Sequence, residues 1–333
     1  MKVLLTKKLL AEDREYLRER IDSGIDIVEP VSWDEQGVIA SMVGVDVLLG
    51  GLLTEVIYQS ARDVNFFQIP WTGIDNLDFD LIQKYDVTVC NSHSSARVVA
   101  EHAVALMLAS ARKIPYHDRL LRAGKWNRVN AGGNAVTPFS RNIFGSRVLL
   151  LGFGGIGQAI ARMLAGFSCR INVVNSTGEK PDLDIEIDTV YPTSQLALAV
   201  ENADWVFVVM PLTETTNNLV DTAVFESMKA ECTLINVSRG AIVDESALFA
   251  ALSTKSIAGA AIDTWYTYPS VSSPESAPSS NFNFAKLDNI VMSPHRAGYA
   301  TGGFPHLDDV AKNLNRAKAG KPLINRISAT KGY

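Results

Sequence analysis

The feature that most constrains the fold is a strand, a glycine-rich turn, a helix and a second strand in direct succession over residues 147–175. Residues 148–151 are apolar and predict a buried strand, and the sequence Gly-Phe-Gly-Gly-Ile-Gly follows at once. In a dinucleotide-binding unit, Gly152 would allow the tight turn, Gly154 the approach of a pyrophosphate, and Gly157 the close packing of helix on strand. This context predicts that a helix N-terminus binds the phosphates of a dinucleotide.

Composition excludes several other classes of protein. The chain has 333 residues, 47% of them hydrophobic and 20% charged, which is ordinary for a globular protein of about two domains. A net charge of -5 and a pI near 5.6 argue against nucleic acid or an anionic membrane as partner. The first residues carry too short an apolar run for a secretory signal, and no stretch approaches the ~18 apolar residues of a membrane span. We therefore expect a cytoplasmic protein.

The cysteines indicate neither disulfides nor a metal site. Cys90, Cys169 and Cys232 are widely spaced, and each lies in or beside an apolar run that is typical of a strand. We expect three buried free thiols. No grouping of cysteine and histidine has the spacing of a zinc site, so no metal is expected.

Strand and helix patterns alternate on both sides of the glycine-rich turn, which predicts an α/β protein. A long helix is predicted over residues 95–113, and the tail after Gly298 is too short for a third domain and is expected to return to the first. The predicted strands cover residues 3–5, 47–49, 66–70, 87–90, 148–151, 171–174, 205–210, 233–237, 257–262 and 289–292. Several of these strands end in polar or glycine-containing turns, where ligands bind in open α/β sheets.

Two residues that directly follow predicted strands have side chains suited to hydride transfer. Arg239 offers a planar pair of donors for a substrate carboxylate. His295 offers a proton for a carbonyl oxygen, since the ordinary pKa of histidine is about 6.5. The alternative is that each is a surface residue without a catalytic role.

Several segments together resemble the D-isomer-specific 2-hydroxyacid dehydrogenases. They are I-N-V-S-R-G-A-I-V-D-E-S-A-L at residues 235–248, G-F-G-G-I-G, A-D-W-V-F-V-V-M-P-L-T-E-T-T, I-A-G-A-A-I-D-T-W, S-P-H-R-A-G, and the upstream G-I-D-N-L-D and V-V-A-E-H-A-V-A-L-M-L-A. The similarity covers nearly the whole chain and is strongest over residues 97–298, in the manner of a glyoxylate or hydroxypyruvate reductase.

The resemblance implies two flavodoxin/Rossmann-like, doubly wound parallel-sheet domains with a cleft between them. Residues 1–96 and 300–333 would form the substrate-binding (catalytic) domain, and residues 97–299 the dinucleotide-binding domain. The helix over residues 95–113 resembles one that links the domains and contributes to a homodimer interface. Its apolar stripe is equally consistent with core packing.

The resemblance also assigns roles to individual residues. Arg239 would bind the substrate carboxylate and carbonyl oxygen, His295 would be the general acid/base, and the backbone amides of Thr72 and Gly73 would bind the carboxylate from the other domain. Asp263 would bond the nicotinamide carboxamide, or else cap a helix. The expected cofactor-binding residues are Gly152, Gly154, Gly155, Ile156, Gly157, Asn175, Ser176, Thr177, Pro211, Val237, Asp263 and Ala297.

The sequence departs from the family pattern at the partner of the catalytic histidine. The family usually has a glutamate five residues beyond the aspartate that corresponds to Asp263, and this chain has Tyr268 there. A tyrosine hydroxyl can orient an imidazole, but as a neutral group it stabilises the imidazolium less. Tyr268 is therefore expected to take the place of the glutamate, and Glu275 is the alternative.

A second departure concerns the choice of cofactor. The residue expected to bind the adenosine ribose is usually acidic, and here it is Asn175, followed by Ser176, Thr177 and Lys180. An aspartate would repel a 2′-phosphate, whereas these side chains can donate hydrogen bonds to it. The sequence therefore favours NADP over NAD.

The predicted function is NAD(P)-dependent hydride transfer between nicotinamide and a small D-2-hydroxy or 2-keto acid, as a reductase of glyoxylate-like or hydroxypyruvate-like acids. Two alternatives remain at this stage. One is oxidation of formate, which needs no proton shuttle and is suggested by Tyr268. The other is a dinucleotide-sensing protein similar to the corepressors that resemble this family.

Overall fold

The computed structural model describes residues 1–126, 128, 139–269, 281–300 and 304–329. The chain divides into two compact units. The smaller unit combines Met1–Ser95 with Ala300–Tyr333, and the larger unit is Ala96–Tyr299. Each unit is built on one parallel sheet, so the predicted fold class of two doubly wound α/β domains is confirmed.

The sheet of the smaller unit has five parallel strands in the order β2-β1-β3-β4-β5. This is the strand order of flavodoxin-like folds. The strands are β1 (Lys2–Leu5), β2 (Asp26–Val28), β3 (Val47–Leu49), β4 (Phe66–Gln68) and β5 (Val89–Cys90). The helices are α1 (Ala11–Arg18), α2 (Glu35–Ala40), α3 (Glu55–Ser60), α4 (Phe79–Lys84) and α11 (Asp308–Lys318).

Each face of this sheet is covered because side chains alternate along a strand. Val3 and Leu5 pack on one face, in a core shared with α11, where Val310 and Leu314 are fully buried. Leu4 points to the opposite face, in a core with residues of α2, α3 and α4. The C-terminal tail thus completes the unit that the N-terminus begins.

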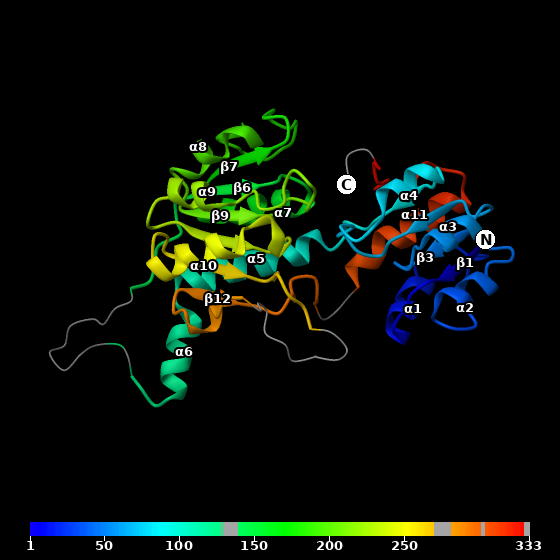
Figure 1. Ribbon diagram of the computed structural model, residues 1–333, viewed down its shortest axis with the longest axis horizontal. Helices are drawn as coiled ribbons and strands as arrows, with labels where there is room; N and C mark the ends of the chain where they lie inside the picture. The colour runs from blue at the N-terminus through cyan, green and yellow to red at the C-terminus, as the bar shows by residue number, and fades with distance from the viewer. Residues whose placement is uncertain (127, 129–138, 270–280, 301–303, 330–333) are drawn as a thin grey trace. The chain divides into compact units, whose positions relative to one another are not determined.

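The sheet of the larger unit has seven parallel strands in the order β12-β11-β10-β9-β6-β7-β8, the arrangement of a Rossmann fold. The strands are β6 (Arg147–Leu151), β7 (Arg170–Asn175), β8 (Thr189–Pro192), β9 (Trp205–Val208), β10 (Thr233–Asn236), β11 (Gly259–Ile262) and β12 (Ile290–Met292). The helices are α5 (Ala96–Ala111), α6 (Ile114–Arg122), α7 (Gly155–Leu164), α8 (Leu196–Val200), α9 (Thr222–Ser227) and α10 (Glu245–Thr254). Figure 1 labels the helices on both faces of this sheet.

The apolar stripe of α5 belongs to the core of the larger unit. Val99, Ala103, Leu106 and Met107 are buried in one cluster with residues of β6, β7 and α7. Of the two interpretations of this stripe, core packing is the one that the structure confirms. The next helix, α6, extends away from the sheet (Figure 1), and the sequence did not predict it.

The remaining differences from the predicted elements lie at exposed places. The edge strands β2 and β8 were not predicted, because their residues are half-exposed and lack an apolar run.

Cys90 and Cys232 are buried free thiols as predicted, but Cys169 is only half-buried, so that expectation was wrong for one of the three. Within the described residues, no helix is long and apolar enough to cross a membrane.

Candidate active site

The glycine-rich turn joins β6 to α7, and its geometry leaves space at the helix N-terminus. Gly152 has a φ of +99°, and a Cβ there would lie 2.8 Å from the carbonyl oxygen of Val209. Gly154 is the N-cap residue of α7, and a Cβ there would meet no described atom within 4 Å. The turn is therefore tight on the side of β9 and open in front of the helix.

This open space fits the pyrophosphate of a dinucleotide. Gly155 and Ile156 are the first residues of α7, where backbone N–H groups have no partner within the helix. The helix dipole adds partial positive charge at the same place. A Cβ at Gly157 would lie 2.6 Å from the carbonyl oxygen of Gly152, so the third glycine allows the close packing of turn and helix.

The end of β7 is organised by Asn175 itself. Its side-chain oxygen accepts hydrogen bonds from the N–H groups of Thr177 (3.1 Å) and Gly178 (2.6 Å), and its amide donates to the carbonyl of Glu179 (2.9 Å). Ser176 and Thr177 are exposed on this turn. Lys180 donates one hydrogen bond to the carbonyl of Ile187 at 2.8 Å.

Three further residues of the expected cofactor site follow neighbouring strands. Pro211 comes after β9 and is exposed, Val237 follows β10 and is buried, and Ala297 lies beyond β12 and is buried. Because β6, β9, β10, β11 and β12 are parallel, their carboxyl ends meet at the edge that carries the glycine-rich turn.

Arg239 lies at the same edge, three residues beyond the end of β10. It is half-buried, and one guanidinium nitrogen donates to the carbonyl of Ser238 at 2.8 Å. Its own carbonyl accepts a hydrogen bond from the side chain of Asn236 at 2.8 Å. The Ser238 hydroxyl donates to the carbonyl of Met210, which ties this loop to the end of β9.

His295 follows β12 and packs against the residue that replaces the family's glutamate. The ring centroids of Tyr268 and His295 are 5.3 Å apart with an angle of 48° between the planes. The Tyr268 hydroxyl accepts a hydrogen bond from the backbone N–H of Trp265 at 3.2 Å. The structure therefore brings Tyr268 and His295 together, whereas Glu275 lies outside the described residues.

Asp263 is fully buried at the end of β11 and caps no helix, since the chain has no helical residue from 264 to 269. The N-cap alternative is therefore wrong. Its carboxylate instead accepts hydrogen bonds from the backbone N–H groups of Arg296 (2.8 Å) and Ala297 (3.0 Å) and from the hydroxyl of Ser293. His102 of α5 lies 3.4 Å from the same carboxylate, a neighbour that no spacing in the sequence indicated.

Thr72 and Gly73 belong to the smaller unit, in the loop after β4. This loop is bound to the one after β5: Thr72 donates its hydroxyl hydrogen to the carbonyl of Ser92 (2.7 Å), and Asn91 donates to the carbonyl of Thr72 (2.8 Å). The N–H of Ser92 donates to the carbonyl of Trp71 at 3.2 Å.

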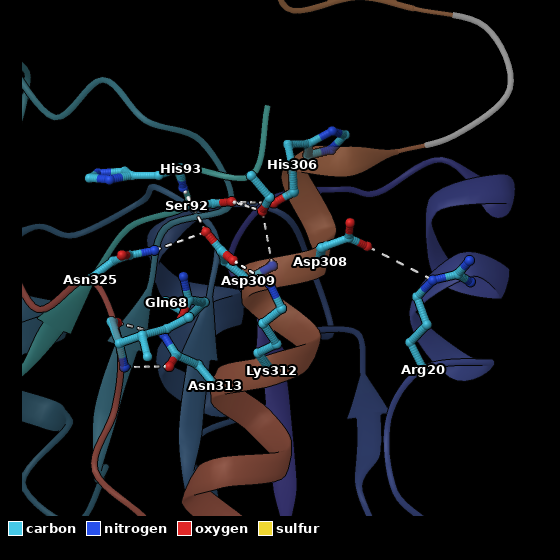
Figure 2. Close-up of polar contacts among 12 residues, drawn as sticks. Arg20, Gln68, Ser92, His93, His306, Asp308, Asp309, Lys312, Asn313 and Asn325 are labelled. Carbon is cyan, nitrogen blue, oxygen red and sulfur yellow. Dashed lines mark hydrogen bonds and ion pairs between the residues drawn. The ribbon is translucent and has the colours of Figure 1, made fainter. Parts of the chain in front are cut away.

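A buried carboxylate of α11 holds the loop after β5 from beneath (Figure 2). Asp309 accepts hydrogen bonds from the N–H of His93 (2.9 Å), from Asn325 (2.9 Å) and from Lys312 (3.2 Å). Burial by itself raises the pKa of Asp309, but the hydrogen bonds from His93 and Lys312 outweigh it, so the pKa lies below its ordinary value. No pattern in the sequence indicates a role for this residue, because it lies in the tail, far from any motif.

The Rossmann strand order and the open glycine-rich turn define a dinucleotide-binding protein. A model of the family described as D-isomer specific 2-hydroxyacid dehydrogenase, NAD binding domain, matches residues 104–297. The chain belongs to this family, and it is an oxidoreductase that uses a nicotinamide cofactor. The family resemblance inferred from the motifs is confirmed.

Individual relatives match most or nearly all of the chain. The glyoxylate reductase of Thermococcus onnurineus is 29% identical over 98% of this chain and 96% of its own length. That of Pyrococcus horikoshii is 30% identical over 84% of this chain and 81% of its own length. Among solved structures, the NADPH-dependent glyoxylate/hydroxypyruvate reductase of Sinorhizobium meliloti has a TM-score of 0.78 and 27% identity, covering 99% of this chain and 98% of that chain.

Proposed function

We propose that this protein reduces a small 2-keto acid, of the size of glyoxylate or hydroxypyruvate, to the D-2-hydroxy acid with NADPH. One observation carries the proposal. Arg239 and His295 follow parallel strands of the Rossmann sheet at the edge that bears the glycine-rich turn. The names of the relatives given above support the substrate class.

The reduction needs three groups: the nicotinamide, Arg239 and His295. A reduced nicotinamide, when bound, supplies the hydride. The Arg239 guanidinium binds the substrate carboxylate through two parallel hydrogen bonds, which fixes the carbonyl carbon. Protonated His295 gives its proton to the carbonyl oxygen as that oxygen gains negative charge, and the product is the hydroxy acid.

Two further groups would complete the site. The ring of Tyr268 packs on the imidazole of His295 and thereby limits its rotation, which is one part of what the usual glutamate does. In the smaller unit, the N–H groups of Thr72 and Gly73 would bind the substrate carboxylate. We accordingly assign substrate binding to this unit and dinucleotide binding to the larger one.

Substitution of the two central residues tests the proposal. We expect His295→Asn to lower kcat for glyoxylate by about 100-fold or more, since general acid catalysis contributes on this scale. Arg239→Lys retains the charge but loses the planar pair of donors, so KM should rise about tenfold or more. Arg170→Lys, at the exposed start of β7, is the matched control and should leave both constants unchanged. Near-normal turnover of His295→Asn with every 2-keto acid tried would refute the proposed function.

The preference for NADP is supported by the end of β7. The carboxamide of Asn175 takes the place of the usual acid and holds the turn that exposes the Ser176 and Thr177 hydroxyls. An Asn175→Asp variant retains the oxygen that accepts from Thr177 and Gly178 but adds a negative charge near a bound 2′-phosphate. We expect its ratio of kcat/KM for NADPH to that for NADH to fall by about tenfold or more. An unchanged ratio, or a wild-type preference for NADH, would contradict the assignment.

The homodimer is also a proposal, and α6 supports it. None of the residues of α6 is buried, and Ile114 and Leu121 are 55% and 58% exposed. Exposed apolar side chains on a helix that extends from its unit are typical of an interface.

A cytoplasmic location is likewise a proposal. The three free thiols support it, because disulfides are rare in the cytosol, and cell fractionation tests it.

The two alternative functions have less support. None of the relatives named above is a formate dehydrogenase or a corepressor. Reduction of NAD(P)+ by formate, measured beside oxidation of NADPH by glyoxylate, separates the first alternative from the proposed function. Tight binding of NADPH with no turnover of any acid would favour the second.

A further inference from the structure

His295 has a left-handed backbone conformation, which is uncommon for residues other than glycine. Its φ is +55°, in the left-handed region, which is unfavourable for a residue other than glycine. A histidine that must present its imidazole to a substrate therefore needs neighbours that hold the main chain in this conformation.

Asp263 makes hydrogen bonds on both sides of His295. Its carbonyl oxygen accepts from the N–H of His295 itself at 2.8 Å. Its carboxylate accepts from the next two N–H groups, those of Arg296 and Ala297, and from the hydroxyl of Ser293 two residues earlier. One fully buried aspartate thus binds four of the five residues from 293 to 297.

His102 of α5 completes this cluster. Its Nε2 lies 3.0 Å from the Ser293 hydroxyl and 3.4 Å from the Asp263 carboxylate, and its side chain is 28% exposed. A carboxylate that is wholly removed from water is stable only when donors or positive charge surround it. The Ser293 hydroxyl donates its own hydrogen to Asp263, so Nε2 of His102 faces this hydroxyl as an N–H donor. The donor comes from α5, a helix far from Asp263 in the sequence.

We propose that His102 and Asp263 are positioning residues, which hold the segment of residues 293–297 so that His295 keeps its left-handed conformation. The inference rests on the proposed catalytic role of His295. Asp263 is expected to contact the nicotinamide, and this inference gives it a second role, which is to bind the main chain around His295. The path runs from α5 through His102 and Ser293 to Asp263, and from there to the N–H groups that flank the imidazole.

The decisive variants are at His102, because this residue is no part of the catalytic or binding machinery. His102→Leu removes the hydrogen bond at similar volume, whereas His102→Gln retains an N–H donor near the position of Nε2. We expect the leucine variant to lower kcat about tenfold with KM for the keto acid little changed, and the glutamine variant to restore most of kcat. Ser110→Ala, also on the buried side of α5, is the matched control and should leave kcat unchanged.

A spectrum of the histidine side chains gives a readout that does not depend on turnover. The chain has five histidines, so ¹³C-labelled imidazoles give few signals, and a His295→Asn variant assigns one of them. In His102→Leu the His295 signal should shift or broaden, and in His102→Gln it should return toward its wild-type position. If the leucine variant fails to fold, Ser293→Ala breaks the same path and should show the same two changes.

The outcomes separate this inference from the proposed function. Wild-type kcat and an unmoved His295 signal in both His102→Leu and Ser293→Ala would overturn the positioning role, even if His295→Asn is inactive. Conversely, an active His295→Asn enzyme would refute the proposed function. A displaced His295 signal in His102→Leu would still support the inference that His102 positions the segment of residues 293–297. A loss of stability with normal kcat and an unmoved signal would mean that His102 only stabilises the fold, which also overturns the inference.

Discussion

Gly152 and Gly154 lie in one turn, but an added methyl group has different surroundings at the two positions. At Gly152 it would meet backbone atoms of Val209 and Met210 at 2.8 and 2.9 Å, in a left-handed conformation. At Gly154 it would enter the open space in front of α7, with an ordinary φ of -73°. The first glycine is required by the protein's own packing, and the second leaves room for a ligand.

The two alanine variants separate these effects. We expect Gly152→Ala to lower the free energy of unfolding by about 2–4 kcal/mol, because left-handed strain and overpacking add together. Gly154→Ala should change stability by less than about 0.5 kcal/mol, while the Kd for NADPH rises about tenfold or more. Thermal unfolding and titration of NADPH fluorescence measure the two quantities. Unchanged affinity in a stable Gly154→Ala protein would contradict the assignment of the pyrophosphate site.

At the scale of elements, α11 supports the loop that follows β5. The Asp309 carboxylate binds the N–H of His93. The neighbouring Asp308 is half-buried and accepts a hydrogen bond from the Tyr16 hydroxyl at 2.7 Å. It also lies 3.9 Å from Arg20 (Figure 2). These two adjacent aspartates therefore form a matched pair, one buried and structural, the other on the surface.

Replacement of each aspartate by asparagine should show this difference. Asp309→Asn is expected to lower the free energy of opening of residues 91–95 by about 1–3 kcal/mol at pH 7, measured by hydrogen exchange. Because the folded-state pKa of Asp309 lies below its ordinary value, the stabilisation is present above that ordinary value, about 3.9, and is lost as the pH falls through the lowered pKa. The difference between wild type and variant should therefore shrink below pH 4.

Asp308→Asn serves as the control and should change the opening energy of residues 91–95 by less than about 0.5 kcal/mol, because Asp308 contacts Tyr16 and Arg20 and makes only a surface ion pair. Equal effects of the two substitutions at pH 7, or a difference for Asp309→Asn that grows on acidification, would show that the carboxylate does not hold this loop.

The strands and helices also differ in how clearly their sequences predict them. The central strands β6, β9 and β10 are buried on both faces, so each is a continuous apolar run that was predicted within two residues of its ends. The edge strands β2 and β8 were missed, because an edge strand meets solvent and needs no such run. The helix α6 was missed for a related reason: no residue of it is buried, so nothing constrains an apolar stripe toward its own unit.

For the whole molecule, the proposed dimer gives a further prediction. Leu121→Glu places a charge on the exposed face of α6, and we expect it to shift the protein from dimer toward monomer in analytical ultracentrifugation. Val43→Glu is the control, since Val43 is 85% exposed in the smaller unit and should not alter the mass. A monomeric wild type, or a Leu121→Glu protein as dimeric as wild type, would refute the α6 interface.

The sequence by itself determined the fold class, the dinucleotide unit and the family, because each depends on local patterns: apolar runs, glycine spacing and short motifs. Only the tertiary structure decided how the candidate residues are held. Tyr268 packs on His295 through its ring, Asn175 closes its own turn, and Asp263 binds the main chain around His295 rather than capping a helix. His102 and Ser293 are 191 residues apart and meet only because α5 packs on the sheet. Contacts of this kind depend on which surfaces burial brings together, and no local pattern encodes them.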